Sequence, residues 1–170
     1  MTWHEKFIAT LKDNDVRLVS YVPDNVLTPL IAGVSADNSF RPVVAAREDE
    51  AIGTVAGAFM GGLRGVVLMQ TSGFGLIANA LATLAVPCQI PVVMAISERG
   101  TLGEFNIGQV LVTRTMRPTL DALSIMHHTL ADAETLPFVV DRALKQAYAT
   151  MSPLAFILSP LLTGGKVFKG

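Results

Sequence analysis

Two groups of residues that could build a ligand-binding site follow two neighbouring apolar runs of the chain. The charged segment Arg-Glu-Asp-Glu at residues 47–50 comes after the apolar run at residues 42–46. The small-residue segment Gln-Thr-Ser-Gly-Phe-Gly at residues 70–75 comes after the next run, at residues 66–69. A carboxylate can share a proton with a ligand, and glycines let a ligand lie against the backbone. We therefore expect an acid to face a glycine loop in one binding site.

Short apolar runs alternate with helix-length segments along the chain. We expect strands at residues 17–22, 42–46, 66–69, 91–96, 124–129 and 154–159. We expect helices at residues 2–14, 25–34, 48–62, 73–85, 115–123 and 133–151. Strands that alternate with helices and are apolar on both faces indicate a parallel sheet covered by helices. The predicted fold is therefore a three-layer α/β/α domain with a mainly parallel six-stranded sheet, spanning residues 1–170 as a single domain.

The carboxyl ends of parallel strands lie at one edge of a sheet, and ligands bind at that edge. The charged segment and the small-residue segment both follow such strand ends. The fifth predicted strand contains His127 and His128 and is the least apolar, so we expect it at a border of the sheet and outside the site. The tail at residues 163–170 is expected to be loosely ordered or bound to a partner.

The composition narrows the class of protein. Hydrophobic residues make up 51% of the chain and the mean hydropathy is +0.48, which favours a large subunit interface. Polar residues and prolines interrupt the uncharged segment between Arg64 and Glu98, so we expect no membrane-spanning helix. A net charge of −1 gives no basic face for nucleic acid. The single cysteine, Cys88, favours the cytoplasm, and we expect its thiol to be buried and inert.

Two other interpretations of the same residues stay open. Gly73, Gly75 and Ala78 match a GxGxxA dinucleotide-binding pattern, and Glu98 ends the next predicted strand. This pattern follows the third predicted strand, whereas a dinucleotide-binding domain carries it after the first. Glu48 on its own is most simply an acid that complements the dipole at the start of a helix.

Three segments together resemble the pyrimidine-binding domain of thiamine-diphosphate-dependent decarboxylases. They are residues 47–57, with the Arg47-Glu48 pair, Ala51 and Gly57, residues 70–75, and residues 90–100. The resemblance runs from about residue 17 to residue 130. It is strongest to sulfopyruvate decarboxylase alpha subunits and the related phosphonopyruvate decarboxylases. In that family the glutamate that matches Glu48 hydrogen-bonds the aminopyrimidine and favours the tautomer that removes the thiazolium proton. The cofactor then attacks a 2-oxo acid and carbon dioxide leaves.

The resemblance also implies the other site residues. Glu48 matches the family spacing better than Glu50, so we expect Glu48 to be catalytic. The expected cofactor contacts are Pro23, Gln70, Thr71, Ser72 and Gly73. The expected substrate contacts are Asn25, Arg99 and Gln109. Arg47 and Arg114 are alternative cations for an anionic head group. We expect Gln109 in a loop at residues 100–110 that is long enough to act as a lid.

The same family holds the diphosphate and its magnesium with a Gly-Asp-Gly motif on a second domain, and this chain has no Gly-Asp-Gly. The resemblance therefore implies that thiamine diphosphate is shared with a beta subunit, which carries the Mg²⁺, and that this chain supplies no metal ligand. The expected function is the alpha subunit of a heteromeric carboxy-lyase for a small anionic 2-oxo acid, above all sulfopyruvate. The alternatives are phosphonopyruvate or another short 2-oxo acid, a non-catalytic assembly module, and a nucleotide-binding domain.

Overall fold

The computed structural model describes residues 1–166 of the chain. Six strands form one sheet in the order β2-β1-β3-β4-β6-β5, and every neighbouring pair is parallel. The strands are β1 (Val16–Tyr21), β2 (Arg41–Val44), β3 (Arg64–Gln70), β4 (Val93–Ser97), β5 (Met126–Leu130) and β6 (Leu154–Leu158). Each of them overlaps a predicted strand, so the predicted parallel sheet is confirmed.

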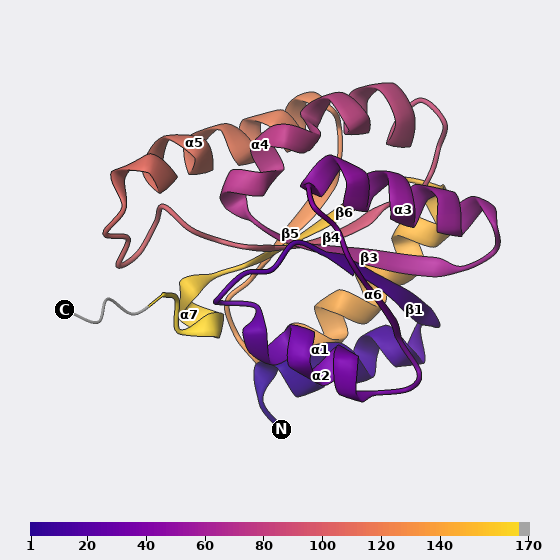
Figure 1. Cartoon of the computed structure of the whole chain (residues 1–170), viewed down its shortest axis with the longest axis horizontal. Helices are drawn as coiled ribbons and strands as arrows, with labels where there is room; N and C mark the ends of the chain where they lie inside the picture. Colours follow the sequence, from indigo (N-terminus) through magenta and orange to yellow (C-terminus); the bar gives the residue numbers. More distant parts are fainter. Residues whose placement is uncertain (167–170) are drawn as a thin grey trace.

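Helices cover both faces of the sheet, as Figure 1 shows. The helices are α1 (Trp3–Asp13), α2 (Thr28–Ala36), α3 (Glu48–Met60), α4 (Thr71–Ala80), α5 (Ile107–Ala122), α6 (Leu136–Thr150) and α7 (Pro160–Thr163), and α4 continues into the π-helix η1 (Leu81–Ala85). Helices α1, α2 and α6 pack on one face, and α3, α4 and α5 pack on the other. The predicted α/β/α arrangement is therefore confirmed.

Alternating strand residues supply the two cores between these layers. In β3, Val66 and Leu68 face α1, α2 and α6, whereas Val67 and Met69 face α3, α4 and α5. All four side chains are fully buried. Because successive side chains of a strand point to opposite faces, a strand covered on both sides must be apolar throughout. This burial holds β3 in the middle of the sheet and fixes where its last residue, Gln70, comes to lie.

The sheet has two border strands. In the described part of the chain, β5 pairs only with β6, as predicted for the strand with His127 and His128. The other border strand, β2, is exposed at all four of its residues. The prediction for Cys88 was wrong: the residue follows η1 in a turn and is exposed. It lies beyond the last helical turn that packs on the sheet, so nothing covers its side chain within residues 1–166.

Only α3 begins at its predicted residue; the largest differences are α5, which begins early, and α2 and α6, which begin late. Helix α5 begins at Ile107 because the Asn106 side chain accepts a hydrogen bond from the Gly108 amide at 2.9 Å, as an N-cap. Gln109 therefore lies in the first turn of α5, and its predicted place in a loop was wrong.

Helix α2 begins later than predicted, at Thr28, because Asp24 forms a turn before it. Its Oδ1 accepts hydrogen bonds from the amides of Val26 and Leu27 at 3.0 and 3.1 Å. No helix within residues 1–166 has the length and apolar character that crossing a membrane requires. The expectation for the tail falls partly on residues 167–170, which lie outside the described residues.

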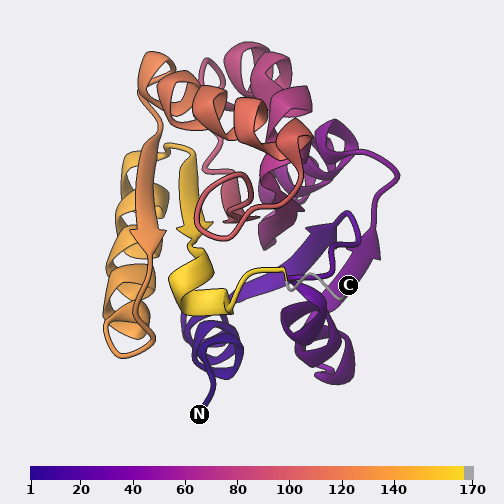
Figure 2. The same cartoon turned by 90° about the vertical axis from the view of Figure 1, so that its left-hand side faces the viewer.

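The carboxyl ends of the strands form one edge of the sheet, which faces the viewer in Figure 2. Helix α7 and the loop at residues 98–106 lie at this edge, because they follow β6 and β4. The starts of α3, α4 and α5 lie there too, since each helix follows such a strand end or this loop. All residues of the predicted site are carried by these segments and by the turn after β1.

Candidate active site

Glu48 is the first residue of α3, and only 8% of it is exposed. Its side chain lies directly on the backbone of Gly73 in α4, where a Cβ atom would overlap Oε1, Cδ and Cγ of Glu48. The structure thus brings together the acid and the glycine of the two segments. Within residues 1–166 no hydrogen bond or ion pair reaches the Glu48 carboxylate. A carboxylate that lies largely inside the fold, without a donor from the described chain, suits a group that meets a ligand.

The charged neighbours of Glu48 have structural contacts instead. Glu50 is exposed, and its Oε2 accepts a hydrogen bond from the Ala46 amide at 2.8 Å, just before α3. Arg47 and Asp49 form an exposed ion pair with Nε–Oδ1 at 3.0 Å. The hydrogen bond between them raises the pKa of Arg47 and lowers the pKa of Asp49. Of the three acids at the start of α3, Glu48 is the one whose side chain is turned into the fold.

Two buried amide oxygens lie at the carboxyl edge without a partner. They are Oε1 of Gln70, the last residue of β3, and Oε1 of Gln109, in the first turn of α5. Neither atom makes a hydrogen bond to any residue in the described chain. Because buried amide oxygens nearly always have a partner, an unpaired one at a strand end marks a place where a ligand can bind.

Thr71 and Ser97 hold the strand ends together. The Thr71 hydroxyl donates to the Ser97 carbonyl at 3.1 Å and accepts a hydrogen bond from the Arg99 amide at 3.0 Å. The Ser97 hydroxyl donates to Oδ1 of Asp24 at 3.1 Å. Since β3 lies between β1 and β4, this bond ties the two flanking strands together beside the end of β3. Ser72, the next residue after Thr71, is half-buried at the start of α4.

Pro23 and Asn25 lie in the turn after β1, and both are exposed. They line an open groove of about 350 Å³ together with Tyr21, Asp24, Thr28, Ile31 and Ala32. The groove runs beside α2, on the layer opposite α3 and α4. Contact of Pro23 with a cofactor, and of Asn25 with a substrate, stays a prediction.

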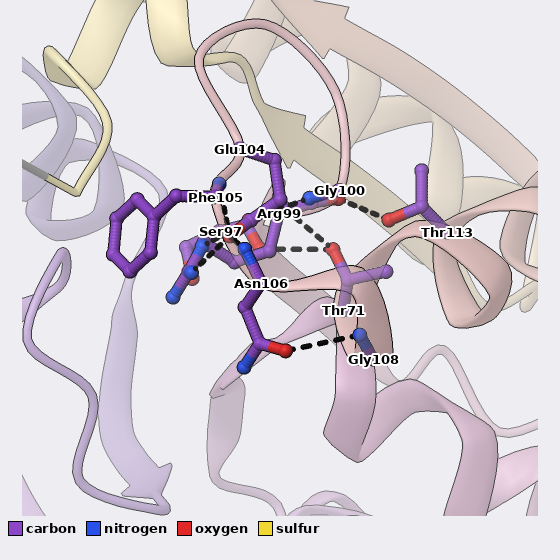
Figure 3. A network of polar contacts seen from close by, with 9 residues as sticks. All are labelled: Thr71, Ser97, Arg99, Gly100, Glu104, Phe105, Asn106, Gly108 and Thr113. Carbon is purple, nitrogen blue, oxygen red and sulfur yellow. Dashed lines mark hydrogen bonds and ion pairs between the residues drawn. The ribbon is translucent and has the colours of Figure 1, made fainter. Parts of the chain in front are cut away.

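Arg99 is buried, and its guanidinium forms two hydrogen bonds with Glu104, at 2.8 and 2.7 Å (Figure 3). The other two candidate cations, Arg47 and Arg114, have exposed side chains. The charge of Arg99 is therefore already balanced inside the chain, and a substrate anion would have to share or replace Glu104.

Sequence reasoning missed Glu104. Its only signal is a single acid between Gly103 and the helix-capping Asn106, five residues after Arg99. Within residues 1–166, no group of three or more His, Cys, Asp or Glu side chains is arranged to hold a metal ion.

Comparisons with known proteins show which proteins the chain is similar to. No protein-family profile matches the chain. The chain is 32% identical over 151 residues to sulfopyruvate decarboxylase subunit alpha of Methanocaldococcus jannaschii, over 89% of each chain. It is 39% identical over 97 residues to phosphonopyruvate decarboxylase of Streptomyces viridochromogenes, over 57% of this chain and 24% of that one.

The fold is also seen in solved structures. A 2-oxoglutarate:ferredoxin oxidoreductase from Magnetococcus marinus superposes with a TM-score of 0.75 at 14% sequence identity. The match covers 96% of this chain and 29% of the oxidoreductase chain. At this identity the likeness concerns the fold alone.

Proposed function

Because this chain belongs to the family of sulfopyruvate decarboxylase alpha subunits, we propose that Glu48 is its catalytic residue, at a thiamine diphosphate site shared with a beta subunit. The observation that carries the proposal is the Glu48 carboxylate, buried against Gly73 and without a donor within residues 1–166. The chain is a decarboxylase subunit, as its family membership shows. Its cofactor contacts and its substrate are the parts that we propose.

The buried groups at the carboxyl edge fit an aminopyrimidine ring. Such a ring carries nitrogen donors and acceptors, and the Glu48 carboxylate and the buried Gln70 oxygen have no partner in the described chain. Gly73 leaves the space that the Glu48 side chain occupies. When bound, thiamine diphosphate supplies a nucleophilic carbon that adds to the 2-oxo acid and takes up the electrons released with carbon dioxide.

Different residues of this chain would then contact the cofactor and the substrate. Glu48 would share a proton with a ring nitrogen, giving it up and taking it back, from a largely buried position. Thr71 and Ser72 at the start of α4, Gln70 before them and Pro23 after β1 hold the ring and its surroundings. On the substrate side we propose Asn25, Arg99 and Gln109. Of these, Arg99 offers the cation that a sulfonate or phosphonate group requires.

We propose sulfopyruvate as the substrate, with sulfoacetaldehyde and carbon dioxide as the products. The M. jannaschii relative is named for that substrate, and the match covers 89% of both chains. The likeness to a phosphonopyruvate decarboxylase favours phosphonopyruvate as the second candidate. Both substrates are short 2-oxo acids with an anionic head group, so one site with one cation serves either.

A beta subunit must complete the site. The chain has no Gly-Asp-Gly segment, so we propose that the beta subunit holds the diphosphate and Mg²⁺. Exposed apolar side chains lie near the edge where it would bind: Leu102 is 68% exposed, Ile107 80% and Leu111 64%. Such side chains favour contact with another chain. The cytoplasmic location rests on the single cysteine and stays a prediction.

The experiment that tests this proposal uses the alpha chain together with a beta subunit from the same source. Thiamine diphosphate binding is measured by calorimetry, and decarboxylation is measured with sulfopyruvate and with phosphonopyruvate. We expect Glu48→Gln to lower kcat by at least about 10²-fold, because the amide cannot take up the proton. Assembly, followed by size-exclusion chromatography, should not change.

Glu50→Gln is the matched control, because Glu50 is exposed and contacts only the start of α3 in the described structure. We expect it to keep wild-type turnover. Full activity of Glu48→Gln would refute the assignment of the catalytic acid. Saturable cofactor binding by the alpha chain alone would refute the shared site.

A further inference from the structure

Glu104 has an unusual number of contacts for a residue in a loop. Only 4% of its side chain is exposed, and its carboxylate accepts five hydrogen bonds. Two come from the Arg99 guanidinium, at 2.8 and 2.7 Å, and three come from the backbone amides of Gly100, Phe105 and Asn106, at 2.9, 3.1 and 2.9 Å. Figure 3 shows this carboxylate inside the loop that it closes. One side chain therefore joins the two ends of residues 98–106.

The loop closed by Glu104 is fastened to the two helices that border the site. The Arg99 amide donates to Thr71 at the start of α4, and the Arg99 carbonyl accepts a hydrogen bond from Thr113 in α5. Gly100 has a φ of +79°, and a Cβ there would overlap the Gln109 carbonyl and the Thr113 hydroxyl. The loop backbone thus packs directly on the first turns of α5. Any change in its shape must move Gln109 or Arg99.

This inference rests on the proposed function. We propose that Glu104 is a positioning residue: its buried carboxylate fixes the loop at residues 98–106 and so holds Arg99 and Gln109 in place for the 2-oxo acid. Glu104 contacts neither cofactor nor substrate in this scheme. It also keeps Arg99 from acting as a free cation until the head group of a substrate arrives.

Glutamine at position 104 is a sharp test because an amide cannot replace both carboxylate oxygens. Oε1 accepts hydrogen bonds from Arg99, Phe105 and Asn106, and Oε2 accepts from Arg99 and Gly100. Whichever way the amide is turned, its NH₂ group faces Arg99 and at least one backbone amide, all of which are donors. Aspartate keeps the charge and both acceptors but is one methylene shorter. It should therefore restore part of the function.

The experiment uses the assembled alpha and beta chains loaded with thiamine diphosphate and Mg²⁺. Hydrogen exchange of residues 98–110 and the steady-state constants for sulfopyruvate are measured for wild type, Glu104→Gln, Glu104→Asp and Asp37→Asn. Asp37 is the matched control: it is also a loop carboxylate with an ion pair, to Lys12, and a backbone hydrogen bond, from Ser39. It precedes β2, at the opposite edge of the sheet.

We expect Glu104→Gln to speed exchange at residues 98–110 and to lower kcat/KM by about 10²-fold, as a shift of about 1 Å in site groups does. Cofactor affinity should stay within about twofold of wild type, because Glu48 and Gly73 lie outside the loop. Glu104→Asp should recover part of the lost kcat/KM, and Asp37→Asn should match wild type. A merely structural role would lower cofactor affinity and kcat/KM together, without rescue by aspartate.

Two results would overturn the proposal: unchanged exchange of residues 98–110 in Glu104→Gln, or faster exchange with unchanged kinetics. If Glu104→Gln does not assemble, Thr113→Val tests the same loop through its contact with the Arg99 carbonyl. That variant should give a smaller effect of the same kind, and wild-type kinetics would overturn the proposal. If instead the wild-type pair decarboxylates no 2-oxo acid, the proposed function fails, while the exchange data still decide whether Glu104 orders the loop.

Discussion

Glu48 and Gly73 depend on each other at the scale of single residues. The acid occupies the volume that a side chain at position 73 would take, so the glycine is required by the position of the carboxylate. This is a steric requirement and not one of backbone conformation, because Gly73 is not among the glycines with positive φ. A substitution at Gly73 therefore acts on the acid without touching it chemically.

We predict that Gly73→Ala displaces the Glu48 carboxylate and weakens thiamine diphosphate binding by the two-chain enzyme at least about tenfold, roughly 1.4 kcal/mol. Gly75→Ala, two residues further along α4, is the control, since a Cβ there meets only Val112 at an ordinary 3.9 Å. Calorimetric titration of both variants measures the effect. Equal affinities of the two variants would show that the position of Glu48 does not depend on Gly73.

The residue types of this pair could be selected from the sequence, but their contact could not. The segments at 47–50 and 70–75 stood out because each follows an apolar run. Choosing Glu48 over Glu50 needed the family resemblance, since both acids lie in the first turn of the same helix. The structure separates them by burial. Glu104 was missed because its importance lies in hydrogen bonds to backbone amides, which leave no pattern of residue types.

At the scale of elements, the loop at residues 98–106 depends on one ionised group. The hydrogen bond from Arg99, aided by backbone hydrogen bonds from Gly100 and Asn106, lowers the pKa of Glu104 from 4.5 to about 2. A carboxyl group whose pKa is lower in the folded state stabilises the fold above its unfolded pKa. That contribution is lost progressively as the pH falls from about 4.5 toward 2.

We therefore predict that wild type is more stable than Glu104→Gln at pH 6 and that the difference shrinks toward pH 3. The expected change in the difference is roughly 2 kcal/mol. Urea unfolding of the wild-type and Glu104→Gln alpha chains, followed by circular dichroism at each pH, measures this difference in stability. Asp37, whose pKa is also lowered to about 2 by its hydrogen bond from Lys12, is present in both chains and cancels. A difference that does not vary with pH would contradict the role of the carboxylate charge.

Helix positions were predictable to the extent that apolar periodicity governs them. All six predicted helices form, but only α3 begins at its predicted residue, and for α2 and α5 side chains decide the first residue. Asp24 binds the amides of Val26 and Leu27 and delays α2, whereas Asn106 caps α5 and starts it early. Such caps depend on the path of the loop before the helix, which residue type alone does not determine.

At the scale of the whole molecule, the hydrophobic side chains lie in two kinds of place. Most hydrophobic side chains fill the two cores on either side of the sheet. Others remain exposed at the start of α5, where Ile107 and Leu111 are one turn apart on the same face. The fold class could be predicted from the alternation of strands and helices. The surface that a partner covers could not, because composition does not say where exposed residues gather.

We predict that the double variant Ile107→Ser and Leu111→Ser weakens association with the beta subunit by about 1–3 kcal/mol while leaving the alpha chain folded. The control is Met60→Ser, at the far end of α3, which is 76% exposed. Analytical ultracentrifugation of the mixed chains measures the dissociation constant. Loss of affinity in the control alone would locate the contact at the opposite edge.

The border strand β2 affects how alpha chains behave before they bind a beta subunit. It is only four residues long, and its second residue, Pro42, has no N–H group to give to a neighbouring chain. Such a strand is a poor template on which another copy could extend the sheet. We therefore expect alpha chains that have not yet bound a beta subunit to have little tendency to aggregate through this strand.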